Sequence, residues 1–319
     1  MKALICGVSG QDGAYLAQFL LEKGYEVWGT SRDAQAASFS NLDALRIRNR
    51  VNIVSMSQSD FRSVFTALET SEPNEVYFLA GQSSVGLSFD LPVETLESIT
   101  IGTLNMLEAI RLRGRTVKFY HASSSECFGD VGNIAADEHT PFHPTSPYAV
   151  SKASAHWLVT NYRNAYGLWA SNGILFNHES PFRPARFVTK KIVATAARIA
   201  RGSEELLTLG RMDIVRDWGW APEYVEAMWL MLQQEKPEDF VIATGKVNRL
   251  QDFVDKTFTH FDLDWRQYTV ISERLYRPSD LSWSQGNPTK SNIILGWEYR
   301  NDMNTVISLL CQAELSKLI

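Results

Sequence analysis

The sequence predicts an α/β protein: a Rossmann-like, doubly wound parallel sheet with a smaller mixed α/β substrate lobe towards the C-terminus. Three observations predict this fold. Short β-rich runs alternate with amphipathic helical patterns, a glycine-rich segment directly follows the first run, and the alternation changes after about residue 177. We therefore expect a Rossmann domain over residues 1–176, to which later segments can return, and a lobe formed mainly by residues 177–319.

The predicted strands are short β-rich runs, and several of them are apolar throughout. Continuous apolar strands are typical of a parallel sheet that helices cover on both faces. In the first half, the expected strands are residues 3–6, 27–29, 51–54, 76–79, 117–121 and 171–176. Later strand candidates are scarcer, and they include residues 206–209 and 240–243.

The segments between the strands carry apolar residues at helical spacing. Tyr15, Phe19 and Leu20 share one face of the first segment, and Gly24 is placed to end it as a C-cap. The same spacing recurs at Val64, Phe65 and Leu68, and at Leu104, Leu107 and Ile110. In the second half, helices are expected at residues 188–201 and 222–234.

Composition and charge exclude several classes of function. The 319 residues are 45% hydrophobic and 21% charged, so we expect a full hydrophobic core. A net charge of −5 without a basic run argues against nucleic acid or an anionic membrane as a partner. Cys6, Cys127 and Cys311 are too few and too distant for a disulfide framework, and no His or Cys spacing predicts a metal. No apolar run approaches the roughly 18 residues that span a bilayer, so we expect a cytoplasmic protein.

The glycine-rich segment after the first strand has the spacing of a dinucleotide-binding turn. Gly7 permits the tight turn, Gly10 lets the backbone approach a pyrophosphate, and Gly13 allows close packing of helix on strand. The first N–H groups of the helix then face the phosphates. The intervening Ser9, Gln11 and Asp12 are therefore candidate cofactor contacts, and a purely structural turn is the alternative.

The choice of cofactor depends on the end of the second strand. An acid about 20 residues beyond the glycines binds the ribose hydroxyl of NAD, and Asp33 fits that distance. An Arg at this place pairs with the 2′-phosphate of NADP, and Arg32 fits that role. The two residues are adjacent, so this pattern alone leaves both cofactors open.

Tyr148 and Lys152 form a candidate catalytic pair. If the segment is helical, their i, i+4 spacing places both side chains on one face. A nearby ammonium favours the tyrosinate and lowers the pKa of the phenol, which makes a base at neutral pH. The fifth strand ends at a serine cluster on the same sheet edge, so Ser124 is placed to hydrogen-bond the oxygen that Tyr148 deprotonates.

Glu126 follows this serine cluster and suggests a second chemical step. Removal of a hydride makes a carbonyl, which acidifies the neighbouring C–H bond. A carboxylate beside it can take that proton and return one to a departing hydroxyl. This is elimination of water, whereas a solvent-facing loop Glu is the alternative interpretation.

These residues resemble the extended short-chain dehydrogenase/reductase family and, within it, the GDP-mannose 4,6-dehydratases. The likeness runs along nearly the whole chain and goes beyond the glycine turn and the Tyr–Lys pair. Its more specific stretches are Gly10–Tyr15 (GQDGAY), Ser123–Gly129 (SSSECFG), Pro144–Lys152 (PTSPYAVSK), Asn161–Tyr166 (NYRNAY), Gly173–Pro181 (GILFNHESP), Phe187–Ile192 (FVTKKI), Arg216–Gly219 (RDWG) and Phe240–Gly245 (FVIATG).

The resemblance implies a particular reaction. A hydride leaves C4 of the hexose for the nicotinamide, with Tyr148 as the base and Ser124 polarising the C4 oxygen. Lys152 tunes Tyr148 and holds the nicotinamide ribose. Glu126 stands at the acid/base position for loss of water between C5 and C6, and the hydride then returns to C6. The expected substrate is GDP-mannose, and the expected product is a 4-keto-6-deoxy sugar nucleotide.

The binding residues follow from the same resemblance. Cofactor contacts are expected, besides the glycine turn, Arg32 and Lys152, at Leu79, Ala80, Gln82, His178 and Arg183. Substrate contacts are expected at Ser83, Asn177, Val188, Lys191, Arg216, Arg277 and Asp280. Arg and Lys side chains in an acidic protein suit a diphosphate.

Four departures from the family pattern lie on the binding side, at Asp33, Met56-Ser57, Phe182-Arg183-Pro184 and Asp280. Asp33 stands where the family usually has a second Arg, and Asp280 stands where it usually has Glu. The resemblance favours NADP on the strength of Arg32, with NAD left open by Asp33. Because relatives form dimers or tetramers, a homodimer or homotetramer is expected.

Three alternatives compete with the dehydratase hypothesis. A GDP-4-keto-6-deoxyhexose reductase or a sugar-nucleotide epimerase of the same family would use the same Tyr148 and Lys152. A reductase has less need of Glu126 and would consume NADPH. A non-catalytic nucleotide-binding protein is the third alternative, since fold alone does not determine function.

Overall fold

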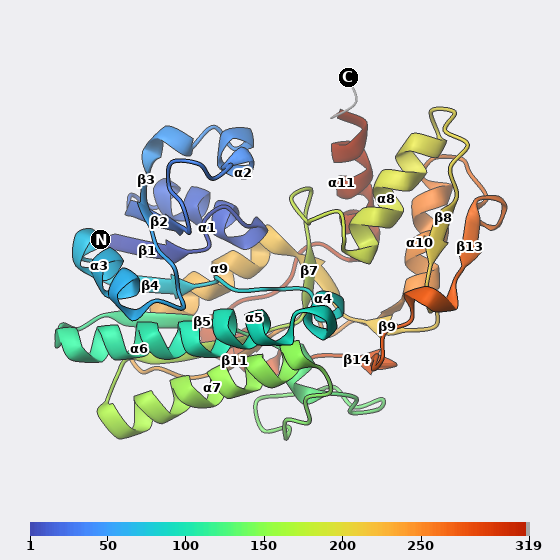
Figure 1. The fold of residues 1–319 in the computed structure, drawn as a ribbon. Coiled ribbons are helices and arrows are strands. Elements are labelled where there is room, and N and C mark those ends of the chain that lie inside the picture. The colour runs from blue at the N-terminus through green and yellow to red at the C-terminus, as the bar shows by residue number, and fades with distance from the viewer. Residues whose placement is uncertain (317–319) are drawn as a thin grey trace.

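Seven parallel strands form the central sheet of the protein, in the order β11-β6-β5-β4-β1-β2-β3 (Figure 1). The computed structural model describes residues 1–316. Every neighbouring pair in this sheet is parallel, which confirms the predicted Rossmann-like fold. The strands are β1 (Lys2–Cys6), β2 (Glu26–Ser31), β3 (Val51–Ser55), β4 (Glu75–Phe78), β5 (Lys118–Ser124), β6 (Ala170–Leu175) and β11 (Phe240–Ile242).

The central strand β1 shows why the strands are apolar throughout. Ala3 and Ile5 face one hydrophobic core, whereas Leu4 and Cys6 face the other. All four side chains are fully buried. Because helices cover both faces of the sheet, residues 3–6 of β1 are all apolar, and the polar residue of the strand, Lys2, stands at its partly exposed start.

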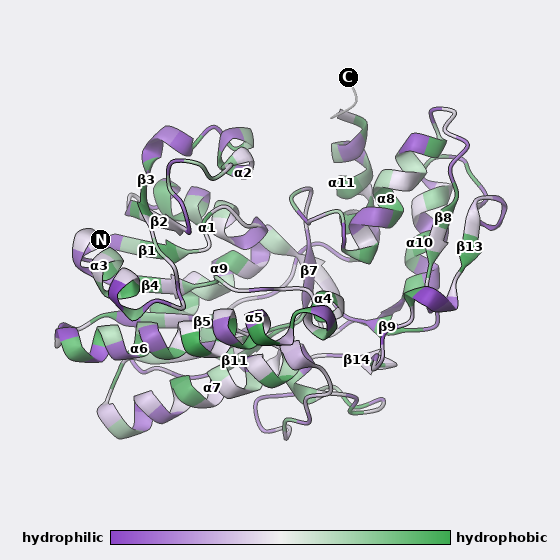
Figure 2. Ribbon diagram, in the orientation of Figure 1, coloured by the Kyte–Doolittle hydropathy of each residue, from purple (hydrophilic) through white to green (hydrophobic). Residues whose placement is uncertain are grey.

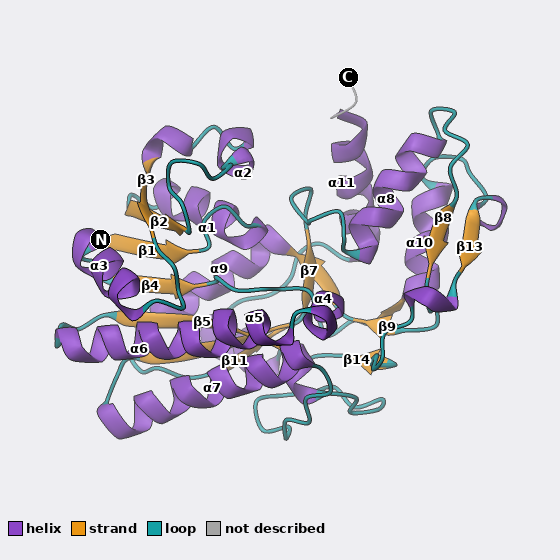
Figure 3. Cartoon of the chain, in the orientation of Figure 1, coloured by secondary structure: helices purple, strands orange, loops and turns teal. Residues whose placement is uncertain are grey.

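Helices cover the two faces of the sheet in separate layers (Figure 3). The helices α1 (Gln11–Glu22) and α9 (Ala221–Leu232) share one core with the sheet. The helices α3 (Phe61–Ser71), α6 (Gly102–Arg113) and α7 (Pro147–Tyr166) share the other. Figure 2 shows hydrophobic and hydrophilic residues interspersed along α6 and α7, as expected for helices with one buried face. Shorter helices are α2 (Ser40–Ala44), α4 (Val85–Asp90) and α5 (Pro92–Leu96).

Segments from the second half of the chain complete the sheet. The strand β11 pairs with β6 in parallel register, with Phe240 opposite Gly173 and Ile242 opposite Leu175. This strand covers an edge of β6 that would otherwise expose unpaired backbone groups. The Rossmann unit therefore contains β11 and α9 in addition to elements from the first 176 residues.

The remaining elements form a lobe beside the carboxyl edge of the sheet (Figure 1). Its core lies between the helices α8 (Val188–Ile199), α10 (Leu250–Thr259) and α11 (Met303–Ser316). Its short strands are β7 (Asn177–Glu179), β8 (Leu207–Leu209), β9 (Val215–Arg216), β10 (Trp218–Trp220), β12 (Asn248–Arg249), β13 (Thr269–Ile271) and β14 (Trp283–Ser284). The last three residues of the predicted lobe, 317–319, lie outside the described residues. Among residues 1–316, no helix has the length and hydropathy needed to cross a bilayer.

Candidate active site

The turn between β1 and α1 forms a cradle that only glycines permit. Gly7 has a φ of +88°, in the left-handed region that other residues rarely adopt. A Cβ on Gly13 would lie 2.3 Å from the Gly7 carbonyl oxygen and 2.7 Å from Val8 Cα. Gly10 caps α1 without a side-chain hydrogen bond, so the first N–H groups of the helix are left for a ligand. This cradle fits the pyrophosphate of a dinucleotide.

We expect Gly13→Ala to weaken dinucleotide binding at least tenfold, because the added methyl group forces the cradle apart. Overpacking of this kind costs about 1–3 kcal/mol, and about 1.4 kcal/mol corresponds to a factor of ten. Calorimetric titration with cofactor measures the effect. Gly86→Ala in α4 is the matched control, since its Cβ meets only the Ser84 hydroxyl at 4.0 Å. Wild-type affinity in the Gly13 variant would contradict this account of the turn.

The loops after β1 and β4 meet where the order of the sheet reverses. In such sheets, ligands bind in the crevice outside the carboxyl ends of the strands at this switch point. Leu79 and Ala80 lie directly against the glycine turn, since a Cβ on Gly7 would approach Ala80 N to 3.2 Å. Gln82 lies just beyond, where its side-chain amide donates within its own loop at 2.8 Å, and Ser83 is exposed.

Arg32 and Asp33, the two residues predicted to discriminate between NADP and NAD, follow β2 directly and have different contacts. Arg32 is exposed, and in the described part of the chain it makes no ion pair. The Asp33 carboxylate instead accepts the backbone N–H groups of Gln35 and Ala36, at 2.8 and 2.9 Å. These bonds lower the pKa of Asp33. Ser9 lies in the glycine turn, where its backbone carbonyl accepts a hydrogen bond from the Asn41 side-chain amide of α2.

A buried hydrogen-bond network ties the start of α1 to β7. The Asp12 carboxylate lies 2.9 Å from Nε2 of His178, and Nδ1 of His178 lies 2.7 Å from the carbonyl oxygen of Phe176. The Gln11 amide donates to the His178 carbonyl and accepts the Ser180 hydroxyl. The structure therefore brings together three of the predicted cofactor residues, which come from distant parts of the sequence.

Charges in this network stabilise one another. Burial alone would lower the pKa of His178, but the Asp12 carboxylate outweighs burial and raises it. Burial alone would raise the pKa of Asp12, but the His178 ring, with a smaller contribution from Arg183, lowers it. Arg183 also lies 3.3 Å from Glu179 and stacks over the Phe187 ring at 3.8 Å.

The candidate catalytic pair lies at the start of α7. The Ser146 hydroxyl caps this helix by accepting the Ala149 N–H, and Pro147 occupies its first turn. Tyr148 and Lys152 follow, one turn apart, and both are at least nine-tenths buried. The Ser124 hydroxyl at the end of β5 lies close enough to the Tyr148 phenol to lower its pKa. The structure thus brings Ser124, Tyr148 and Lys152 together, as the spacing suggests.

The prediction that the Lys152 ammonium lowers the pKa of the Tyr148 phenol is wrong for this arrangement of side chains. Burial raises the pKa of Tyr148 above its ordinary value, and only the Ser124 hydroxyl and a distant guanidinium oppose it. The Lys152 ammonium makes no hydrogen bond to the phenol within residues 1–316: Nζ donates to the Ala122 carbonyl at 2.7 Å and lies 5.9 Å from the Tyr148 ring centre. Burial also lowers the pKa of Lys152 to about 8.

Glu126 lies beside Ser124 and faces the lobe. Its backbone N–H donates to the Ser124 hydroxyl oxygen at 3.2 Å, which fixes the two residues together. Burial raises the pKa of the Glu126 carboxyl, although Arg216 and Arg277 act in the opposite direction. The Asp280 carboxylate lies 3.2 Å from Arg216 and 3.4 Å from Arg277, so it bridges the two guanidinium groups. The Glu126 carboxyl is within electrostatic range of both arginines, so it can exchange protons beside an anionic ligand that they bind.

The other predicted substrate residues line β7 and α8. Asn177 begins β7 and pairs with Trp218 of β10. Val188 is the first residue of α8 and is half-buried against the core of the lobe. The Lys191 ammonium donates to the Thr208 carbonyl of β8 at 2.6 Å, so in this structure its charge is turned towards the lobe.

Asp217 is a buried residue that sequence reasoning missed. It follows Arg216 and accepts hydrogen bonds from the backbone N–H and the hydroxyl of Thr244 and from the Gly245 N–H. Burial raises its pKa to about 6. These bonds fasten the turn that carries Arg216 to the carboxyl end of β11. The sequence signal that could have identified Asp217 is an acidic residue directly after Arg216, which is predicted to bind the diphosphate.

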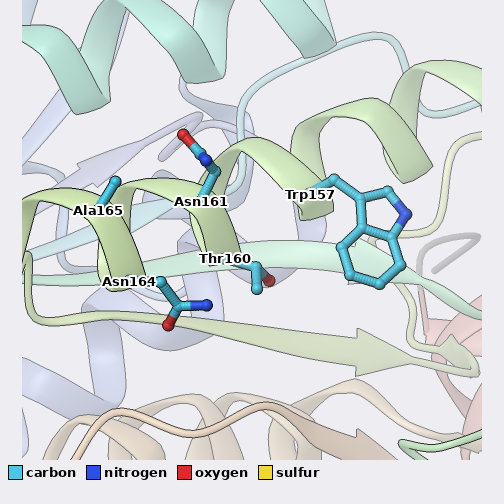
Figure 4. A pocket seen from close by; sticks show the side chains of 5 residues that line it. All are labelled: Trp157, Thr160, Asn161, Asn164 and Ala165. Carbon is cyan, nitrogen blue, oxygen red and sulfur yellow. The ribbon is translucent and has the colours of Figure 1, made fainter.

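A shallow surface pocket lies on α7, apart from these residues (Figure 4). Its lining side chains are Trp157, Thr160, Asn161, Asn164 and Ala165. None of them is a candidate catalytic or binding residue.

The fold and the site define a class of protein: a Rossmann-type member of the short-chain dehydrogenase/reductases, with a Tyr–Lys pair at the carboxyl edge of its sheet. The family model described as GDP-mannose 4,6 dehydratase matches residues 4–310. The chain therefore belongs to the GDP-mannose 4,6-dehydratase family.

Individual relatives agree with this assignment. The chain is 44% identical to GDP-mannose 4,6 dehydratase 2 of Arabidopsis thaliana, over 98% of this chain and 86% of that protein. It is 41% identical to GDP-mannose 4,6 dehydratase of Homo sapiens, over 98% and 91%. Among solved structures, UDP-glucose 4-epimerase of Thermotoga maritima with UDP-glucose superposes with a TM-score of 0.89 at 23% identity over the full length of both chains, which shows the shared fold.

Proposed function

We propose that this protein converts GDP-mannose to GDP-4-keto-6-deoxymannose by internal hydride transfer and loss of water. The observation that carries the proposal is the placement of Glu126 next to Ser124, which itself lies beside the Tyr148 phenol. An oxidising pair alone suits a reductase or an epimerase, whereas an added acid/base group suits elimination. The relatives named for this reaction cover nearly the whole chain.

Tyr148 takes the proton from the C4 hydroxyl of the sugar in this proposal. The Ser124 hydroxyl lies beside the phenol and can hold the same substrate oxygen. Tyr148 lies in the first turn of α7, where the positive end of the helix dipole favours a phenolate. A nicotinamide dinucleotide, when bound in the glycine cradle, supplies the hydride acceptor for C4 and the donor for C6.

Glu126 serves the elimination of water. Because burial raises the pKa of its carboxyl, the group holds a proton to a higher pH than a free Glu. It can take the C5 proton as a carboxylate and return a proton to the departing C6 hydroxyl as an acid. Arg216 and Arg277, bridged by Asp280, suit the diphosphate of the substrate on the side of the lobe.

Incubation of GDP-mannose with the enzyme and a catalytic amount of cofactor tests the proposed function. We expect a 4-keto product in many-fold excess over the cofactor, with no net formation of NADPH. A requirement for stoichiometric NADPH would instead support a reductase. Tight cofactor binding without turnover over a panel of sugar nucleotides would support a non-catalytic protein.

We further propose NADP as the cofactor. Oδ1 of the Asp33 carboxylate accepts two backbone N–H groups of its own loop, which ties this side chain to the loop. Arg32, next to it, is exposed and can pair with the 2′-phosphate. The homo-oligomer and the cytoplasmic location stay predictions.

Arg32→Ala is expected to weaken NADP binding by about 10–100-fold and to leave NAD binding unchanged, since a hydrogen bond to a charged group contributes about 1.5–3 kcal/mol. Calorimetric titration with both cofactors measures the ratio. Arg62→Ala, at another exposed position, is the control. An unchanged preference in the Arg32 variant would contradict the assignment of NADP to this side chain.

A further inference from the structure

The buried face of α7 continues beyond the catalytic pair. Tyr148, Lys152 and His156 are spaced four residues apart, so they form one stripe along the helix that faces the sheet. His156 is only 5% exposed, with the Phe142 ring at 4.8 Å on one side. The proposed reaction assigns no role to this buried imidazole.

Each ring nitrogen of His156 faces a polar partner. Nδ1 lies 3.1 Å from the Ser123 hydroxyl oxygen, and Nε2 lies 3.8 Å from the Asp239 carboxylate. Burial lowers the pKa of His156 to about 4 despite the nearby carboxylate, so the ring is neutral at physiological pH. A carboxylate only accepts, so Nε2 carries the hydrogen and Nδ1 accepts the Ser123 hydroxyl.

Asp239 provides a fixed point for this arrangement. It receives two hydrogen bonds from the Arg163 guanidinium, at 2.7 and 2.8 Å, and one from the Asn172 N–H at 2.8 Å. Arg163 belongs to the second half of α7, so that half is attached to β6 and the start of β11. The contact between His156 and Ser123 likewise attaches α7 to β5, at a place nearer to Tyr148 and Lys152.

Ser123 directly precedes Ser124 on β5. A shift of α7 along the strand therefore changes the position of Tyr148 relative to Ser124, and a shift of about 1 Å can cost about a hundredfold in rate. We propose that His156 is a positioning residue, whose hydrogen bond with Ser123 holds α7 so that Tyr148 and Lys152 face Ser124. This inference rests on the proposed function for its kinetic test.

Three variants separate positioning from simple stability. His156→Leu and Ser123→Ala remove the hydrogen bond, whereas His156→Asn keeps a polar atom near the place of Nδ1. We expect the first two to lower kcat about tenfold or more per folded, cofactor-loaded site, with KM for GDP-mannose unchanged. The Asn variant should recover most of kcat. Asn161→Ala, on the pocket-lining face of α7, is the control for general damage to the helix (Figure 4).

The outcomes are distinct. Unchanged kcat per folded site in Ser123→Ala would overturn the proposal even if the Leu variant fails to fold. A Leu variant that loses only stability, or an Asn variant no better than Leu, would also overturn it. Turnover by the wild type in the same assay tests the proposed function separately.

Nitrogen-15 NMR of histidine-labelled protein tests the same bond without substrate. We expect His156 to be the neutral tautomer with hydrogen on Nε2, and its Nδ1 resonance to move in Ser123→Ala. An Nδ1 resonance that does not move would refute the hydrogen bond, whatever the kinetics show.

Discussion

Tyr148→Phe is expected to abolish hydride transfer while cofactor binding is retained. General base catalysis by a positioned side chain contributes about 10²–10⁴-fold, so kcat should fall by at least a hundredfold. The phenol is buried beside Ser124, so removal of one oxygen atom leaves the packing of the ring intact. Stopped-flow absorbance at the reduced nicotinamide band, after mixing with GDP-mannose, measures the first transfer directly.

Tyr162→Phe is the matched control for this substitution. It makes the same change on the same helix, but its hydroxyl donates to the Glu108 carboxylate, on α6. We expect near-normal turnover in this control. Near-normal turnover in Tyr148→Phe as well would remove Tyr148 from the proposed mechanism.

Glu126→Gln is expected to oxidise C4 normally and then to stall before water leaves. The amide keeps the size of the side chain but neither accepts the C5 proton nor donates one to the C6 hydroxyl. Reduced cofactor should therefore accumulate on the enzyme, and exchange of the C5 hydrogen with deuterated water should vanish. Overall turnover should fall by about 10²–10⁴-fold, the range for loss of a general acid/base.

Glu138→Gln is the control for the Glu126 variant. Burial also raises the pKa of Glu138, which accepts the Val241 N–H of β11. Its amide variant can still accept that hydrogen bond, so turnover should be retained. Exchange at the C5 position at the normal rate in Glu126→Gln would exclude Glu126 as the base.

Local patterns in the sequence predict most of the Rossmann unit. Residues 3–6 of β1 alternate between two cores, so they had to be apolar at each of these positions. The backbone requires glycine at position 7 because φ is positive there, and at position 13 because a Cβ would clash with the turn. Both requirements are visible in the sequence as the spacing of the glycines. The four-residue spacing of Tyr148 and Lys152 needed only a helix to bring both onto one face.

Features that depend on tertiary contacts could not be predicted in this way. The pairing of β11 with β6 joins residues about 70 positions apart, and nothing local marks the partner. Asp217 and His156 gain their roles from Thr244 and Ser123, which are distant in the sequence. The Lys152 ammonium donates to the Ala122 carbonyl, and burial raises the pKa of Tyr148; neither has a signal in the sequence spacing.

The most direct test of the account follows the hydrogen atom on C4 of the substrate. GDP-mannose with deuterium at C4 is incubated with the enzyme and a catalytic amount of cofactor, and the product is analysed by NMR and mass spectrometry. The account predicts one deuterium at C6 of a 4-keto product that has lost one water, with the cofactor unchanged in amount and redox state. Deuterium that returns to C4 without loss of water, or turnover only with stoichiometric NADPH, would contradict it.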